Sequence, residues 1–117
     1  KFWNEVSHKF DQVTSIFTKS KSVKFYIYDG GKIDNDVITI QKDGKVILFK
    51  HQISEKKELI EVPVTANTTR ITIIAESTGT IGTTTAIIEV KDDSNDIKTL
   101  TSLNKGEKTE IDILKKM

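Results

Sequence analysis

Hydrophobic and polar residues alternate along most of the chain, and this period of two begins at Val23. Val23, Phe25 and Ile27 are separated by Lys24 and Tyr26, as expected for a strand with one buried face. The same pattern, rich in β-branched and aromatic residues, predicts eight strands. They cover residues 23–28, 38–41, 45–51, 58–64, 70–76, 84–91, 97–102 and 109–115.

The segments between these strands contain residues that favour turns. Asp43-Gly44 separates two predicted strands by two residues and therefore predicts a tight hairpin. Short strands with frequent turn signals are typical of an antiparallel β-sandwich, either Ig-like or jelly-roll-like, and a small barrel is the alternative. We therefore expect an all-β domain over residues 22–117.

The first residues of the chain follow a different pattern. Apolar residues recur there at steps of three and four, the spacing that places side chains on one face of a helix. This spacing predicts a short amphipathic helix in an N-terminal segment covering residues 1–21. The apolar positions are Phe2, Val6, Phe10, Val13 and Phe17.

The composition removes several classes of function. Eighteen Lys and Arg balance seventeen Asp and Glu, so the net charge of +1 lacks the positive excess that nucleic-acid binding requires. We expect no nucleic-acid partner. The absence of cysteine excludes disulfides, thiolate metal sites and a cysteine nucleophile. No apolar run approaches the length of a membrane-spanning helix, so we expect no membrane insertion by this segment.

An acidic run between the first two predicted strands is the most suggestive local feature. Asp29, Asp34 and Asp36 lie within eight residues, and two glycines between them favour a compact loop. Carboxylate oxygens are the hard ligands that Ca²⁺ prefers, so these three residues are the predicted metal site. The alternative is a surface turn in which Asp and Asn side chains bind nearby backbone amides.

A second loop, at residues 76–85, is rich in glycine and threonine. Its backbone amides could bind an anion or a sugar, but it lacks the lysine of a phosphate-binding loop, which favours a simple connection. If successive strands run up and down, four loops share one end of the sandwich. They are residues 29–35, 53–57, 77–83 and 103–107.

Signals for catalysis are weak. His8 and His51 lie on different predicted elements, and no GxSxG motif supplies a serine nucleophile. We therefore predict no catalytic and no cofactor-binding residues, and we expect that the protein is not an enzyme.

Two loop segments carry a resemblance to a known family. Residues 29–36 followed by Asp43-Gly44 resemble a run of the form DNGxxDGDxxxxxxNG, and residues 75–86 resemble a run of the form ENxGxxPPNTA. Both runs belong to an uncharacterised β-sandwich domain of secreted and surface-associated proteins from Bacteroidetes-type bacteria. The resemblance covers residues 22–115. The chain has Gly30 in place of the family's Asn, Asn35 in place of its central Gly, and Gly82-Thr83-Thr84 in place of its Pro-Pro-Asn. It implies an exported domain located in the periplasm, on the cell surface or outside the cell, and it implies no catalytic residue.

Three functions are therefore compared. The leading hypothesis is a non-enzymatic binding or structural module of an exported cell-envelope protein, with a protein or cell-surface component as its partner and Ca²⁺ in the acidic loop. A carbohydrate-binding accessory domain is the second, because Tyr26 and Tyr28 share one face of a predicted strand and Trp3 is a further aromatic candidate. A small hydrolase using Asp34 and Asp36 is the third.

Overall fold

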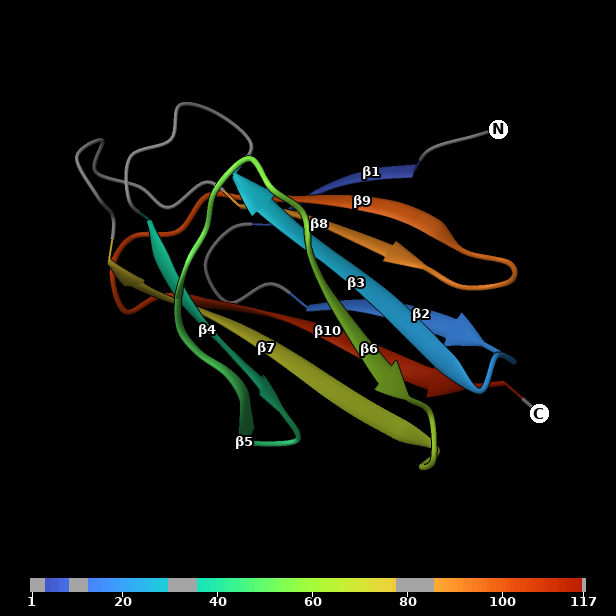
Figure 1. Cartoon of the computed structure of the whole chain (residues 1–117). Coiled ribbons are helices and arrows are strands. Elements are labelled where there is room, and N and C mark those ends of the chain that lie inside the picture. The colour runs from blue at the N-terminus through green and yellow to red at the C-terminus, as the bar shows by residue number, and fades with distance from the viewer. Residues whose placement is uncertain (1–3, 9–12, 30–35, 78–85, 117) are drawn as a thin grey trace.

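The computed structural model describes residues 4–8, 13–29, 36–77 and 86–116, and every regular element among them is a strand (Figure 1). The eight strands predicted from Val23 onward are all present, with bounds close to those expected. The ten strands are β1 (Asn4–His8), β2 (Val13–Thr18), β3 (Ser22–Asp29), β4 (Val37–Lys42), β5 (Lys45–Gln52), β6 (Glu58–Pro63), β7 (Thr68–Ser77), β8 (Ala86–Lys91), β9 (Asp96–Thr101) and β10 (Lys108–Lys115).

The strands form two five-stranded sheets that pack as a β-sandwich. Sheet A has the order β1-β9-β8-β3-β6, and sheet B has the order β2-β10-β7-β4-β5. Among the described strands only β4–β5 and β8–β9 are consecutive neighbours within one sheet, and every other connection crosses between the sheets. The two separate sheets favour the predicted sandwich over the small barrel.

The prediction of an N-terminal helix is wrong for the described residues, which form β1 and β2. β1 pairs in parallel with β9, and β2 pairs in parallel with β10, so both sheets are mixed. In β2 the buried Ile16 and Thr18 alternate with the exposed Ser15 and Phe17, which is a period of two. β-branched and hydroxyl residues disfavour a helix here, and the edges of β9 and β10 supply hydrogen bonds to an extended chain.

The core lies between the two sheets and follows the alternation of the strands. In β3 the inward residues Val23, Phe25 and Ile27 are each at most 2% exposed. Apolar residues from the facing strands of sheet B complete the same cluster. Burying such side chains away from water is the main favourable contribution to folding. The sheet B members include Ile38, Ile40, Ile71, Ile73, Ile111 and Ile113.

The predicted hairpin between β4 and β5 is confirmed. Asp43 and Gly44 both have positive φ, 50° and 84°, as a two-residue hairpin turn of the primed type requires. The turn is held against β7, because the Arg70 amide donates to Asp43 Oδ1 at 2.9 Å. The Asp43 amide in turn donates to the Arg70 carbonyl at 2.8 Å.

The strand directions define two ends of the sandwich. The loop end holds the residues that flank the connections after β3, β5, β7 and β9, and the hairpin end holds Asp43-Gly44 and the connections after β6 and β8. The predicted grouping of four loops is therefore confirmed for their described flanks. The described part of the chain contains no helix long and apolar enough to span a bilayer.

Truncation of the core tests this packing. Ile111 is fully buried in sheet B, and we expect Ile111→Ala to lower the free energy of unfolding by about 2–4 kcal/mol, through lost burial and the cavity left behind. Phe17→Ala is the control, because Phe17 is 59% exposed, and its effect should stay within about 1 kcal/mol. Urea unfolding followed by circular dichroism measures both. Equal losses would contradict the assigned core.

Candidate functional site

The structure describes only the two residues that flank the acidic loop. Asp29 ends β3 and is 7% exposed, and Asp36 precedes β4 and is 1% exposed. The connection after β5 binds both flanking residues. The Asp29 amide donates to the Ser54 carbonyl at 2.7 Å, and the Ile53 amide donates to the Asp36 carbonyl at 3.0 Å. Asp34 lies outside the described residues. Calcium binding by Asp29, Asp34 and Asp36 therefore stays a prediction.

The second loop is also described only at its flanks. Glu76 and Ser77 end β7, and Ala86 begins β8, whereas residues 78–85 lie outside the described part of the chain. Ala86 pairs with Asp29 across β8 and β3, so the flanks of the two loops meet at the loop end. The Thr101 hydroxyl fixes this flank, since it accepts from the Ala86 amide at 3.1 Å and donates to the Ala86 carbonyl at 2.9 Å.

The two histidines are far apart in the fold. His8 ends β1 at one edge of sheet A, and His51 is on β5 at the edge of sheet B, on the opposite side of the sandwich. Within the described ranges, no group of three or more His, Asp or Glu side chains is placed to hold a metal ion.

A polar cluster lies on the outer face of sheet A. Its centre is Glu89 on β8, whose side chain is 1% exposed although it points away from the core. The Tyr28 hydroxyl donates to Glu89 Oε2. Lys57 Nζ donates to the same oxygen at 3.2 Å, and Lys91 Nζ lies 3.5 Å from Oε1. We call these four residues the Glu89 cluster.

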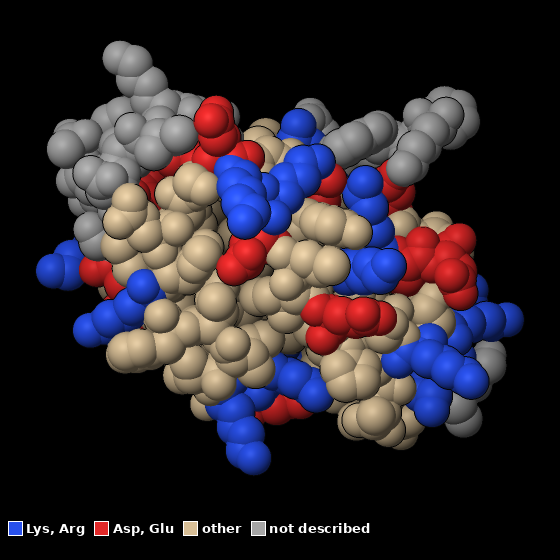
Figure 2. Space-filling model, viewed as in Figure 1, with Lys and Arg blue, Asp and Glu red and all other residues tan. Residues whose placement is uncertain are grey.

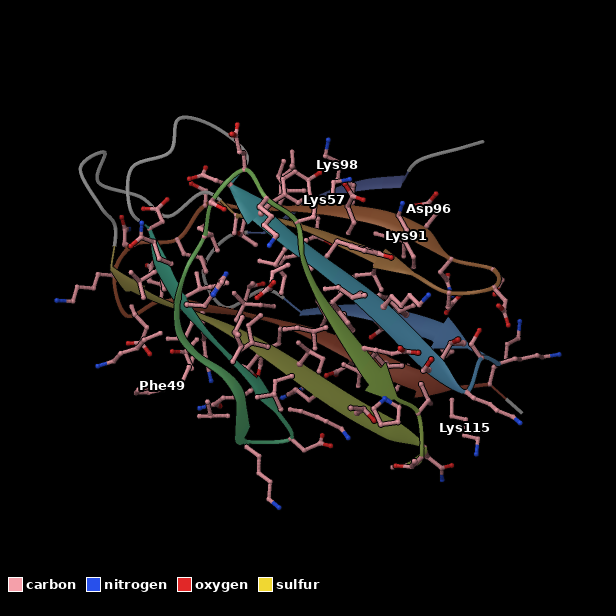
Figure 3. All side chains as sticks on the ribbon, viewed as in Figure 1. Phe49, Lys57, Lys91, Asp96, Lys98 and Lys115 are labelled. Atoms are coloured by element: carbon pink, nitrogen blue, oxygen red, sulfur yellow. The ribbon has the colours of Figure 1, made fainter. Side chains whose placement is uncertain are left out.

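Strand register explains how the Glu89 cluster assembles. Glu89 is opposite Tyr26 on β3 and opposite Lys98 on β9, so long side chains flank it on both sides. In Figure 3 the labelled Lys57, Lys91 and Lys98 gather over sheet A. Lys57 comes from the connection between β5 and β6, and its ammonium lies 5.1 Å from the centre of the Tyr28 ring. The surrounding side chains thus exclude water from a carboxylate on the outer face.

The protonation states in the Glu89 cluster follow from these contacts. Burial acts to raise the pKa of Glu89, but the hydrogen bonds from Tyr28 and Lys57 and the charges of Lys57 and Lys91 hold it below its usual value. Burial, followed by the hydrogen bond to Glu89 and the charge of Glu89, raises the pKa of Tyr28 well above its usual value. At neutral pH Glu89 is therefore a charged acceptor, and Tyr28 is a neutral donor.

A shallow groove lies beside the Glu89 cluster on the same face. Its volume is about 450 Å³, and it is open to solvent. Lys91 joins the groove to the cluster, because its ammonium pairs with Glu89 and lies 5.6 Å from the centre of the Tyr26 ring. The groove thus combines an aromatic ring with hydroxyl, ammonium and carboxylate groups. Its lining residues are Ser22, Lys24, Tyr26, Glu61, Lys91, Asp92 and Asp93.

Sheet B carries a smaller ionic cluster on its own outer face. Arg70 forms a two-pronged pair with Asp112, with Nε–Oδ1 at 2.8 Å and Nη2–Oδ2 at 2.9 Å. The same guanidinium lies 3.6 Å from Glu110, and the hydrogen bond from Arg70 is the main cause that lowers the pKa of Asp112. The guanidinium donors of Arg70 are thus directed to the neighbouring strand β10, which is a stabilising arrangement.

Sequence reasoning identified part of the outer face of sheet A. The expectation that Tyr26 and Tyr28 share a face is confirmed, but Glu89 and its lysines were missed. A signal was present, since Glu89 is the one charged residue in the otherwise apolar run 86–90. A charge inside such a run indicates a partner on the outer face, but it does not name Lys57, which is distant in sequence.

The comparisons with known proteins assign no family. No protein-family model matches the chain, and a search of curated proteins found no relative of it.

The Glu89 cluster generates a prediction for acid stability. The pKa of Glu89 is lower in the folded chain than the ordinary glutamate value of about 4.3. Its contribution to stability is therefore complete above that ordinary value, and it is lost as the pH falls through the lower pKa of the folded state. We expect Glu89→Gln to lower the free energy of unfolding at neutral pH by about 1–3 kcal/mol.

The loss of folding stability in acid is the sharper measurement. We expect Glu89→Gln to lose less stability than the wild type when the pH is lowered from about 6 to about 3, because one of the carboxylates with a lowered pKa is gone. Asp92 and Asp112, which also have lowered pKa values, remain in both proteins. Glu55→Gln, at an exposed position, is the control. Urea unfolding at several pH values gives the free energy of unfolding as a function of pH. Parallel curves for wild type and Glu89→Gln would refute the lowered pKa assigned to Glu89.

Proposed function

We propose that the chain is a non-enzymatic binding module that holds its ligand on the outer face of sheet A. The observation that carries this proposal is the groove beside Tyr26, which is bordered by Lys91 and, through it, by the Glu89 cluster. The strands beneath are buried and paired on both sides, so the face is rigid and its polar groups are already oriented. A preorganised face of this kind favours recognition.

The chemistry of the groove fits an oligosaccharide best. Sugar hydroxyls both donate and accept hydrogen bonds, and the groove offers donors from Lys24 and Lys91 together with acceptors from Glu61 and Asp93. The ring of Tyr26 adds an apolar surface with a polar tip, the combination that suits the faces of a sugar. This mixed lining favours a glycan over a purely anionic ligand, which the carboxylates would repel.

The setting of the module is also part of the proposal. The resemblance of residues 29–36 and 75–86 to loops of a secreted bacterial domain supports an exported cell-envelope protein. Under this proposal Ca²⁺ binds at the loop end through Asp29, Asp34 and Asp36. The supporting observation is that Asp29 and Asp36 are buried and that the same short segment, Ile53–Ser54, holds both of their main chains.

Glycan binding is tested by substitution in the groove. The wild type should bind members of an array of bacterial envelope and host glycans, and calorimetry with the best binder should show an affinity loss of about tenfold or more for Tyr26→Ala. Phe17→Ala is the matched control, because Phe17 is an exposed aromatic residue on sheet B, and it should bind as the wild type does. Silence of the wild type across the array, or unchanged binding by Tyr26→Ala, would remove the glycan assignment.

Calcium binding has its own measurement. A few millimolar Ca²⁺ should raise the melting temperature of chelator-treated protein, because a ligand that binds only the folded state stabilises it, by about 1–2 kcal/mol for a site of sub-millimolar affinity. Asp36→Asn should abolish the rise, whereas Asp93→Asn, at the hairpin end, should keep it. A melting temperature that does not change when Ca²⁺ is added would contradict this calcium site.

A further inference from the structure

One lateral side of the sandwich exposes apolar side chains on two edge strands. β5 is the last strand of sheet B and β6 is the last strand of sheet A, and the two do not pair with each other. Val46, Ile47 and Phe49 on β5 are 48%, 40% and 66% exposed, and Leu59 on β6 is 49% exposed. These four residues form what we call the apolar edge. Figure 1 shows both strands on the same side of the molecule, and Figure 2 shows a largely uncharged surface over them.

The apolar edge is continuous with the core. Ile47 and the partly buried Ile60 line a narrow apolar crevice whose inner wall includes the core residues Phe25, Ile40 and Ile88. The opposite lateral side differs, because β1 and β2 are added there as parallel edge strands. At the β5–β6 side the apolar interior thus comes close to solvent. An exposed apolar strip on two unpaired edges marks an interaction surface.

The charges on the two edge strands are opposite. β5 contains Lys45 and Lys50 and no acidic residue. β6 contains Glu58 and Glu61 and no basic residue. This surface is basic on one half, acidic on the other and apolar between them. Two copies related by a twofold rotation can therefore place the basic half of each against the acidic half of the other.

We propose that the apolar edge binds a second copy of this chain, with a twofold axis parallel to the strands. This axis places β5 of each copy beside β6 of the other. The two strands then run antiparallel, because β5 runs toward the loop end and β6 runs away from it. Lys45 faces Glu61 of the other copy, Lys50 faces Glu58, and the apolar side chains meet between these pairs.

The charge pattern selects this axis over the other twofold arrangement. A twofold axis perpendicular to the sheets would pair β5 with β5 and β6 with β6, which brings lysine-bearing edges together and glutamate-bearing edges together. Like charges in such positions are repulsive. Bulges in β5 interrupt its register with β4, and Lys50 has a positive φ of 46°. Side-chain packing therefore carries the contact more than a continuous main-chain ladder does.

Charge exchange between the two edges tests the proposal. We expect the wild type to show a monomer–dimer equilibrium by sedimentation, with a dissociation constant on the order of 10–100 µM. The variant K45E/K50E has two acidic edges, and the variant E58K/E61K has two basic edges. Each alone should self-associate at least about tenfold more weakly. Their equimolar mixture should recover the wild-type affinity as a heterodimer, because both contacts are then oppositely charged.

Two controls separate the interface from net charge and from misfolding. K105E/K116E makes the same charge change at exposed positions away from the apolar edge and should dimerise as the wild type does. Val46→Lys places a charge within the apolar strip and should prevent dimerisation. Circular dichroism verifies the fold of each variant.

Three outcomes overturn the proposal. The first is a wild type that stays monomeric up to about 500 µM, a concentration well above the expected dissociation constant. The second is a charge-exchanged variant that self-associates as the wild type does, as the perpendicular axis would require. The third is a mixture that fails to recover association. The glycan test measures ligand binding at Tyr26, whereas these three outcomes concern self-association, so failure of one proposal is distinguishable from failure of the other. Glu61 belongs to both surfaces, because it lines the groove and lies on β6.

Discussion

The structure depends on the mutual burial of the two inward sheet faces. Alternate side chains of the strands point into the core between the sheets, where residues such as Val23, Ile88 and Ile111 lose nearly all contact with water. Neither sheet could keep its apolar face exposed, so each sheet supplies the environment that the other needs. The outer faces are then free to carry polar chemistry, because the free energy of folding comes from the inner ones.

The outer face of sheet A uses that freedom in an unusual way. Its centre is a carboxylate that is as well shielded as a core residue, because Tyr28, Lys57 and Lys91 cover Glu89. A buried charge is tolerated only when its partners replace the lost hydration. The same contacts orient the lysines and keep the tyrosine neutral, so a stabilising network also fixes the geometry of the adjacent groove.

The strands were predictable because their signal is local. The alternation around Phe25 and Ile27 and the Asp43-Gly44 turn depend on neighbouring residues, and the structure reproduces them. The N-terminal segment was mispredicted because Val13 and Phe17 fit a helical spacing by chance, whereas pairing with the distant β10 determines the result. Tertiary pairing overrides local pattern where an open strand edge is available.

The candidate site was less predictable than the strands for the same reason. The shared face of Tyr26 and Tyr28 follows from the period of a strand. The contact between Lys57 and Glu89 joins residues of different elements, so it requires the strand order of sheet A, which the sequence pattern does not contain. Opposite charges on β5 and β6 are visible in the sequence, but their place on one lateral side is not.

The repeated crossing of the chain between the sheets has a kinetic consequence. Apart from the β4–β5 and β8–β9 hairpins, each described strand must find partners that are remote along the chain. Beyond these two hairpins, neither layer can grow from a contiguous segment, so several large loops must close, at a cost in chain entropy, before most of the stabilising contacts form. Chains of such high contact order fold on timescales of milliseconds to seconds and do so cooperatively. Sheet B therefore cannot be completed on a nascent polypeptide before β10, which joins β2 to β7, has been synthesised.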